Sequence, residues 1–118
     1  MSGGENMYSL LTNKVYLYLL VYYNGWPLPS YVALSRGIKL TRQTVATKVK
    51  ELRSEGILLD DELGNIQVLN PLNLDVNVIE EYLQSGERFD ARKLLRKVLK
   101  EPVTEAEISY LLGRSKNR

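Results

Sequence analysis

The segment TRQTVATKVKELRSEGILL, residues 41–59, constrains the fold more than any other part of this chain. Thr41 is suited to cap a helix, and Gly56 is suited to end one. Between them, apolar side chains recur at the spacing of one helical face: Val45, Val49 and Leu52. The segment therefore predicts an amphipathic helix over residues 41–54 that leads directly into a short apolar strand.

The residues before this helix predict a shorter helix and a turn. NGWPLP, residues 24–29, is a clear break, and we expect Trp26 to anchor this loop by packing onto the core. Ser30 offers an N-cap for a helix over YVALSR. Gly37 in the following GIKL supplies the backbone freedom that a tight turn needs.

The residues after it predict a hairpin and then more helices. ILLD and IQVL read as two short strands that meet around ELGN, a sequence that tolerates positive φ angles. A helix is expected from about Val76 to Gln84, and a basic helix from roughly Asp90 to Lys100. Thr104 with Glu107 forms a capping box for a last short helix.

An almost wholly apolar helix is expected near the start of the chain, from about Met7 to Asn24. A helix with so little polar surface is usually buried on more than one side. Its tyrosines recur at helical spacings: Tyr8, Tyr16, Tyr18, Tyr22 and Tyr23. We interpret them as core and subunit interface in preference to a stacking platform for single-stranded nucleic acid.

This order of elements, and above all LTRQTVATKVKELRSEGIL, resembles the winged helix-turn-helix superfamily over roughly residues 10–70. Small bacterial and archaeal regulators of the MarR and PadR kind are similar at this level. The resemblance implies a mainly α fold with a small β-hairpin, namely a winged helix-turn-helix with added C-terminal helices. The acidic hairpin residues Asp60, Asp61 and Glu62 depart from a wing that lies against phosphates.

The expected organisation has three parts. Residues 1–6 form a disordered N-terminus, 7–70 the winged helix-turn-helix domain, and 71–118 a C-terminal helical extension for dimerisation or docking. The first helix and the extension hold more apolar surface than a three-helix core covers, which favours a symmetric homodimer.

The face opposite the apolar stripe of helix 41–54 carries side chains suited to double-stranded DNA, because an α-helix fits the major groove. Glutamine pairs with adenine, arginine with guanine or phosphate, and threonine offers a hydroxyl or meets a thymine methyl. The candidate DNA-binding residues are Thr41, Arg42, Gln43, Thr44, Thr47, Lys48, Lys50 and, in the hairpin, Asn65. The alternative is a simply solvated face.

The C-terminal part carries a second basic surface. Its candidate phosphate-binding residues lie at one-turn spacings: Arg92, Lys93, Arg96, Lys97 and Lys100. Such a ridge could follow a DNA backbone and add a salt-dependent, sequence-independent contribution. The alternative is the solvent-exposed face of an ordinary amphipathic helix.

The amino-acid composition limits which catalytic and metal-binding sites this chain can form. The chain has no cysteine and no histidine, and its formal net charge is only +2. These absences remove thiolates, the commonest metal ligand and the commonest general base, so we expect no enzyme activity, no catalytic residue, no metal and no cofactor. No apolar run approaches the roughly 20 residues of a membrane span, and no signal peptide is evident. We expect a soluble cytoplasmic protein.

The leading hypothesis is a sequence-specific DNA-binding protein, most simply a dimeric transcriptional regulator that reads an inverted repeat. One alternative is a replication or partition protein that binds origin or centromere DNA with the same fold. Another is a winged helix that binds only protein, which the acidic hairpin and the near-neutral charge favour.

Overall fold

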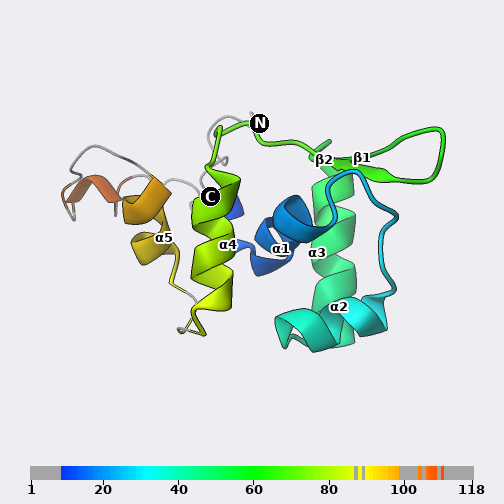
Figure 1. Cartoon of the computed structure of the whole chain (residues 1–118), viewed down its shortest axis with the longest axis horizontal. Coiled ribbons are helices and arrows are strands. Elements are labelled where there is room, and N and C mark those ends of the chain that lie inside the picture. Colours follow the sequence, from blue (N-terminus) through cyan, green and yellow to red (C-terminus); the bar gives the residue numbers. More distant parts are fainter. Residues whose placement is uncertain are drawn as a thin grey trace. The chain divides into compact units, whose positions relative to one another are not determined.

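The computed structural model describes residues 9–86, 88, 90–98, 104, 106–108 and 110. The elements are, in order, α1 (Lys14–Tyr22), α2 (Tyr31–Ile38), α3 (Arg42–Ser54), β1 (Leu58–Asp60), β2 (Ile66–Val68), α4 (Val76–Gln84) and α5 (Ala91–Val98) (Figure 1). The fold is therefore mainly α with a small antiparallel hairpin, as the sequence predicts.

The chain divides into two compact units. One unit is Asn13–Asn70, which holds α1 to β2. The other contains α4 and α5 and also the residues that precede Asn13. We refer to these as the first and second unit.

Local signals set the ends of α3 as predicted. The Thr41 hydroxyl accepts the Thr44 backbone N–H at 3.1 Å, which completes the N-cap. At the other end Gly56 has a φ of 76°, and the Ile57 N–H reaches the Leu52 carbonyl at 2.9 Å. This left-handed glycine with a bond back to the last turn is a Schellman ending.

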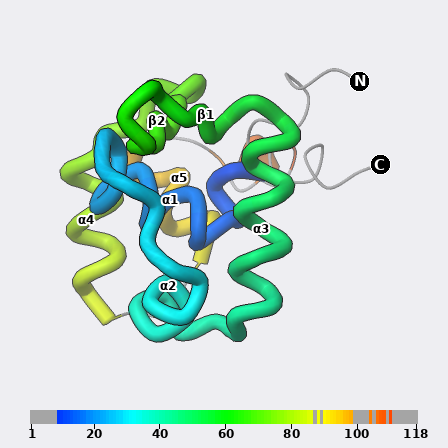
Figure 2. The backbone as a smooth tube through the Cα atoms, turned by 90° about the vertical axis from the view of Figure 1, so that its right-hand side faces the viewer, coloured from blue at the N-terminus to red at the C-terminus, as the bar shows by residue number. Residues whose placement is uncertain are grey.

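The core of the first unit is formed along α3 and the inner side of the hairpin. The predicted stripe of Val45, Val49 and Leu52 is buried. In the hairpin, alternate residues face inward, and the buried ones are Leu58, Ile66 and Val68. α3 contacts α1, α2 and β1 (Figure 2), so its apolar face is covered on three sides.

The first helix is shorter than expected. α1 begins at Lys14, because the Asn13 side chain accepts the Tyr16 N–H at 3.1 Å and caps the helix there. Residues 9–12 form a separate 3₁₀ turn, and residues 7 and 8 lie outside the described residues. The prediction of one continuous helix over residues 7–24 was therefore wrong. The N-cap at Asn13 separates the 3₁₀ turn from α1.

The residue that allows the turn between α2 and α3 is not the one predicted. Gly37 lies within α2, and the left-handed residue is Lys39, with φ 66° and ψ 44°. A Cβ atom on Gly37 would lie 2.5 Å from the Tyr18 hydroxyl oxygen. Gly37 is thus needed for close packing of α1 on α2, and its assignment to the turn was wrong.

The hairpin has a second neighbour that sequence reasoning missed. β1 and β2 pair in register, with Leu59 opposite Gln67. On its other edge Ile66 bonds with the loop before α2, accepting from the Gly25 N–H at 2.8 Å and donating to the Trp26 carbonyl at 2.9 Å. An antiparallel bridge between Pro27 and Asn65 continues this contact. β2 is consequently an inner strand although the hairpin itself has only two strands.

The Trp26 side chain does not anchor this loop, and that prediction was wrong. Its exposed fraction is 65%. Backbone pairing with Ile66 holds the loop instead, and the Asn24 side chain adds a bond from the Val68 N–H at 3.0 Å. Buried Tyr16 donates its hydroxyl to the Leu69 carbonyl at 2.8 Å, and burial raises the pKa of Tyr16 well above its ordinary value.

The second unit is organised around Tyr82 of α4. Asp75 caps α4, whose bounds agree with the predicted helix. The buried Tyr82 hydroxyl donates to the Asp90 carbonyl at 3.0 Å, directly before α5. The predicted capping box is also present, with the Glu107 N–H bonded to the Thr104 hydroxyl at 3.1 Å and the Thr104 N–H to the Glu107 carboxylate at 3.0 Å.

Among the residues that the structure describes, no helix has the length and apolar character that crossing a membrane requires.

Candidate nucleic-acid interface

The exposed face of α3 lies opposite the buried stripe, as predicted. Arg42, Gln43, Thr47 and Lys50 are exposed. Thr44 and Lys48 are half-buried on the margins of this face. Gln43, Thr47 and Lys50 therefore lie together opposite the buried stripe, and Arg42, Thr44 and Lys48 lie on the two flanks of this face.

Hydrogen bonds within α3 decide what its threonines offer to a ligand. Thr41 donates its hydroxyl to the Thr44 hydroxyl at 2.8 Å, and Thr47 donates to the Gln43 carbonyl at 3.0 Å. The Thr47 proton is thereby used within the helix. Outward, Thr47 offers its methyl group and an oxygen lone pair, which suit a thymine methyl or an amino group of a base.

The charged residues of α3 differ in their surroundings. The Lys48 ammonium lies 3.9 Å from the Glu51 carboxylate, an exposed pair one turn apart. Such pairs are weak, but this one reduces the field of Lys48. Arg42, Gln43 and Lys50 make no side-chain hydrogen bond or ion pair in the described part of the chain. These three side chains are the ones available to a ligand.

Charge is distributed unevenly along the first unit. Between Ser30 and Lys50 the chain has five basic residues and no acidic one. Two of them, Arg36 on α2 and Lys39 in the turn, are exposed and were not among the predicted site residues. The acid-free run in the sequence was the signal that could have identified them.

The acidic residues of the first unit begin in the last turn of α3 and continue into the hairpin: Glu51, Glu55, Asp60, Asp61 and Glu62. The hairpin lies at the end of α3 away from the basic turn (Figures 1 and 2). α3 has 13 residues, so its two ends are about 20 Å apart. Asp60 pairs with Arg53 of α3, and Asp61 accepts the N–H groups of Leu63 and Asn65 at 2.8 and 2.9 Å. Of the three acidic side chains in the hairpin, Asp61 therefore stabilises its turn, and Asp60 joins β1 to α3.

Asn65 is not brought near the other predicted DNA-binding residues. It is half-buried in the hairpin, where its backbone bonds with Asp61, whereas Arg42 and Gln43 begin α3 at the opposite end. The structure thus groups the helix residues into one site and leaves Asn65 outside it.

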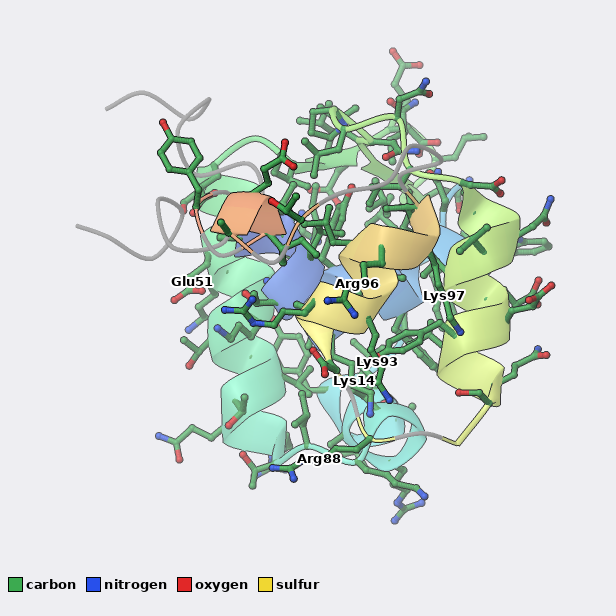
Figure 3. All side chains as sticks on the ribbon, turned by 90° about the vertical axis from the view of Figure 1, so that its left-hand side faces the viewer. Lys14, Glu51, Arg88, Lys93, Arg96 and Lys97 are labelled. Atoms are coloured by element: carbon green, nitrogen blue, oxygen red, sulfur yellow. The ribbon has the colours of Figure 1, made fainter. Side chains whose placement is uncertain are left out.

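The basic surface on α5 is exposed as the sequence suggests. Arg92, Lys93, Arg96 and Lys97 are exposed, and the intervening Leu94 and Leu95 are buried. Figure 3 shows Lys93, Arg96 and Lys97 projecting from this helix. The Lys97 ammonium lies 5.6 Å from the centre of the Tyr82 ring, a cation–π contact that directs it toward α4. Lys100 lies outside the described residues.

The described residues contain no group of three or more carboxylates arranged to hold a metal ion. Searches against protein-family models, curated proteins and solved structures found no match to this chain.

Proposed function

We propose that this protein binds double-stranded DNA sequence-specifically, with α3 in the major groove. The observation that carries the proposal is the exposed set of Arg42, Gln43 and Lys50, which have no side-chain partner among the described residues and lie in the acid-free run from Ser30 to Lys50. The order of α1, a bridging segment at Pro27, α2, α3 and the hairpin supports a winged helix-turn-helix arrangement.

Each side chain has a distinct role in this proposal. Gln43 bonds an adenine edge in a bidentate manner, and Thr47 contacts a neighbouring thymine methyl. Arg42 pairs with guanine or a phosphate, and Lys48 and Lys50 contact phosphates, which positions the helix without specifying sequence. The set favours a half-site that contains A·T pairs.

A dimeric transcriptional regulator is the biological role that we propose. Two copies would place their α3 helices in successive major grooves, roughly 34 Å apart, and bind an inverted repeat. In α1 and at its C-cap, the half-buried apolar and aromatic side chains left for a subunit contact are Tyr18, Val21, Tyr22 and Tyr23. Sedimentation at several concentrations, with and without Tyr22→Ala, tests this dimer. An origin- or centromere-binding role uses the same interface and differs in where the sites lie in the genome.

Selection from a pool of random duplex DNA tests the DNA-binding function. The wild type is expected to enrich one motif, and a Gln43→Ala, Lys50→Ala double variant is expected to lose it. Gln67→Ala with Lys14→Ala is the matched control, because it removes the same two side-chain types elsewhere in the first unit. A motif that the Gln43 and Lys50 variant retains would contradict the assignment.

A second candidate function is protein binding through the hairpin. Trp26 and Leu63 are 65% and 85% exposed, and Leu63 directly follows the acidic Asp61 and Glu62 in the chain. Exposed aromatic and apolar side chains together with acidic ones suit a basic protein surface. Failure of the wild type to bind DNA at any salt concentration would favour this function over the first.

A further inference from the structure

The turn between α2 and α3 contains a lysine in a conformation that side chains rarely adopt. Lys39 has φ 66° and ψ 44°, and its N–H bonds back to the Ser35 carbonyl at 2.8 Å. Glycine is the usual residue at such a position, because a Cβ atom is strained there. The same unit has glycine at Gly25, Gly56 and Gly64, where φ is likewise positive.

Packing does not account for Lys39. Its side chain is exposed, and it makes no hydrogen bond or ion pair in the described part of the chain. A strained residue whose side chain does not pack in the core is a candidate for binding a ligand.

Two further cations flank this lysine. Arg36 precedes it by three residues on α2, and Arg42 follows it by three at the start of α3. Both are exposed, and both lack an ion-pair partner among the described residues. With no acidic residue from Ser30 to Lys50, three uncompensated cations lie around one tight turn.

We propose that Arg36, Lys39 and Arg42 bind the phosphodiester backbone of DNA beside the groove that α3 enters. The inference rests on the proposed function and deepens it, because it assigns backbone contacts to Arg36 and Lys39, which lie outside α3, and gives Arg42 a phosphate as its partner. Ammonium and guanidinium groups bind phosphates by charge-assisted hydrogen bonds, and these contacts carry no sequence information. In this proposal Lys39 supplies a positive charge for binding, and its strained backbone lowers the stability of the fold.

The test is Lys39→Gly, which removes the charge and the strain together. The melting temperature is expected to rise by about 3 to 6 °C, since glycine relieves the left-handed strain. The affinity for the selected DNA is expected to fall about eightfold at 0.1 M salt, and the slope of log affinity against log salt to shrink by about 0.9. The preferred sequence should not change.

Two variants complete the experiment. Lys39→Arg keeps the charge and the strain, so its affinity, salt slope and melting temperature should match those of the wild type. Lys14→Gln removes one cation of α1 and should leave the salt slope unchanged.

An unchanged salt slope in Lys39→Gly would overturn the phosphate assignment while the α3 proposal stands. A melting temperature that stays level or falls would overturn the argument from strain. No DNA binding by the wild type would overturn the proposed function itself, so the two failures are distinguishable.

Discussion

Substitutions at Gly37 and Tyr18 test directly how α1 packs on α2. Replacement of Gly37 by alanine in an ordinary helix would stabilise the fold by about 0.5 to 1 kcal/mol, because alanine restricts the unfolded chain. Here the added Cβ would lie 2.5 Å from the Tyr18 hydroxyl oxygen and 3.1 Å from ring atom Cζ. Overpacking of this kind costs about 1 to 3 kcal/mol. The two contributions together leave a net loss for Gly37→Ala of about 0 to 2.5 kcal/mol, with about 1 kcal/mol at the middle of the range.

Tyr18→Phe removes the closest atom and should reverse most of this loss. The remaining contact, at 3.1 Å, needs a shift of a few tenths of an ångström. Gly37→Ala in the Tyr18→Phe background is therefore expected to change the free energy of unfolding by less than about 0.5 kcal/mol. The resulting coupling energy between the two positions is about 1 kcal/mol, within the range of residues that touch.

Urea unfolding of the four proteins in this cycle measures the coupling. Tyr22→Phe is the matched control, because Tyr22 lies in the same aromatic cluster, with its ring centre 4.9 Å from that of Tyr18. Gly37→Ala should cost the same in the Tyr22→Phe background as in the wild type. Equal losses with Tyr18 and Phe at position 18, or a more stable Gly37→Ala protein, would refute the steric explanation.

Three further predictions concern the hairpin, the capping box and α5. Asp61→Ala removes the acceptor of two backbone N–H groups and should lower the free energy of unfolding by about 1 to 2 kcal/mol in urea, whereas Asp61→Asn, which keeps an oxygen there, should lose less. The N–H of Thr104 and then its hydroxyl lower the pKa of Glu107, so the capping box should be intact above the ordinary glutamate pKa and be lost as pH falls through the lowered value. An NMR titration of the Glu107 carboxyl should show this low midpoint, and Thr104→Val should raise it; an ordinary midpoint in the wild type would contradict the bond. Lys93→Gln with Arg96→Gln should reduce the salt slope of DNA binding by up to about 1.8 without altering the selected motif, if α5 contacts phosphates. An unchanged slope would leave these residues as a solvated helix face.

Elements whose signals are local in the chain were predicted well. The N-caps of Ser30 and Thr41, the ending at Gly56 and the buried stripe of α3 each depend on residues within a few positions of one another. Hydrogen bonding by a capping hydroxyl and burial of one helical face are short-range rules. For the same reason the exposed face of α3 could be identified before its surroundings were known.

Features that depend on residues distant in the chain were missed or predicted wrongly. The role of Gly37 is set by Tyr18, which comes 19 residues earlier, and the pairing of the Trp26 loop is set by Ile66. Glycine and proline near a turn indicate a break in secondary structure but not its neighbours. The exposed Trp26 shows the same limit, because an apolar side chain alone does not reveal whether a core surface lies beside it.

Spacing and local hydrogen bonding account for the mainly helical composition, the caps, the hairpin and the polar face of α3, so these could be read from the amino-acid order. Three features depend on the folded arrangement: Lys39 carries the strain of the turn, Gly37 serves packing, and β2 is an inner strand. The folded arrangement also separates the basic turn from the acidic hairpin by the length of α3. These features depend on which surfaces pack together, because close packing brings into contact atoms of residues that are far apart in the sequence.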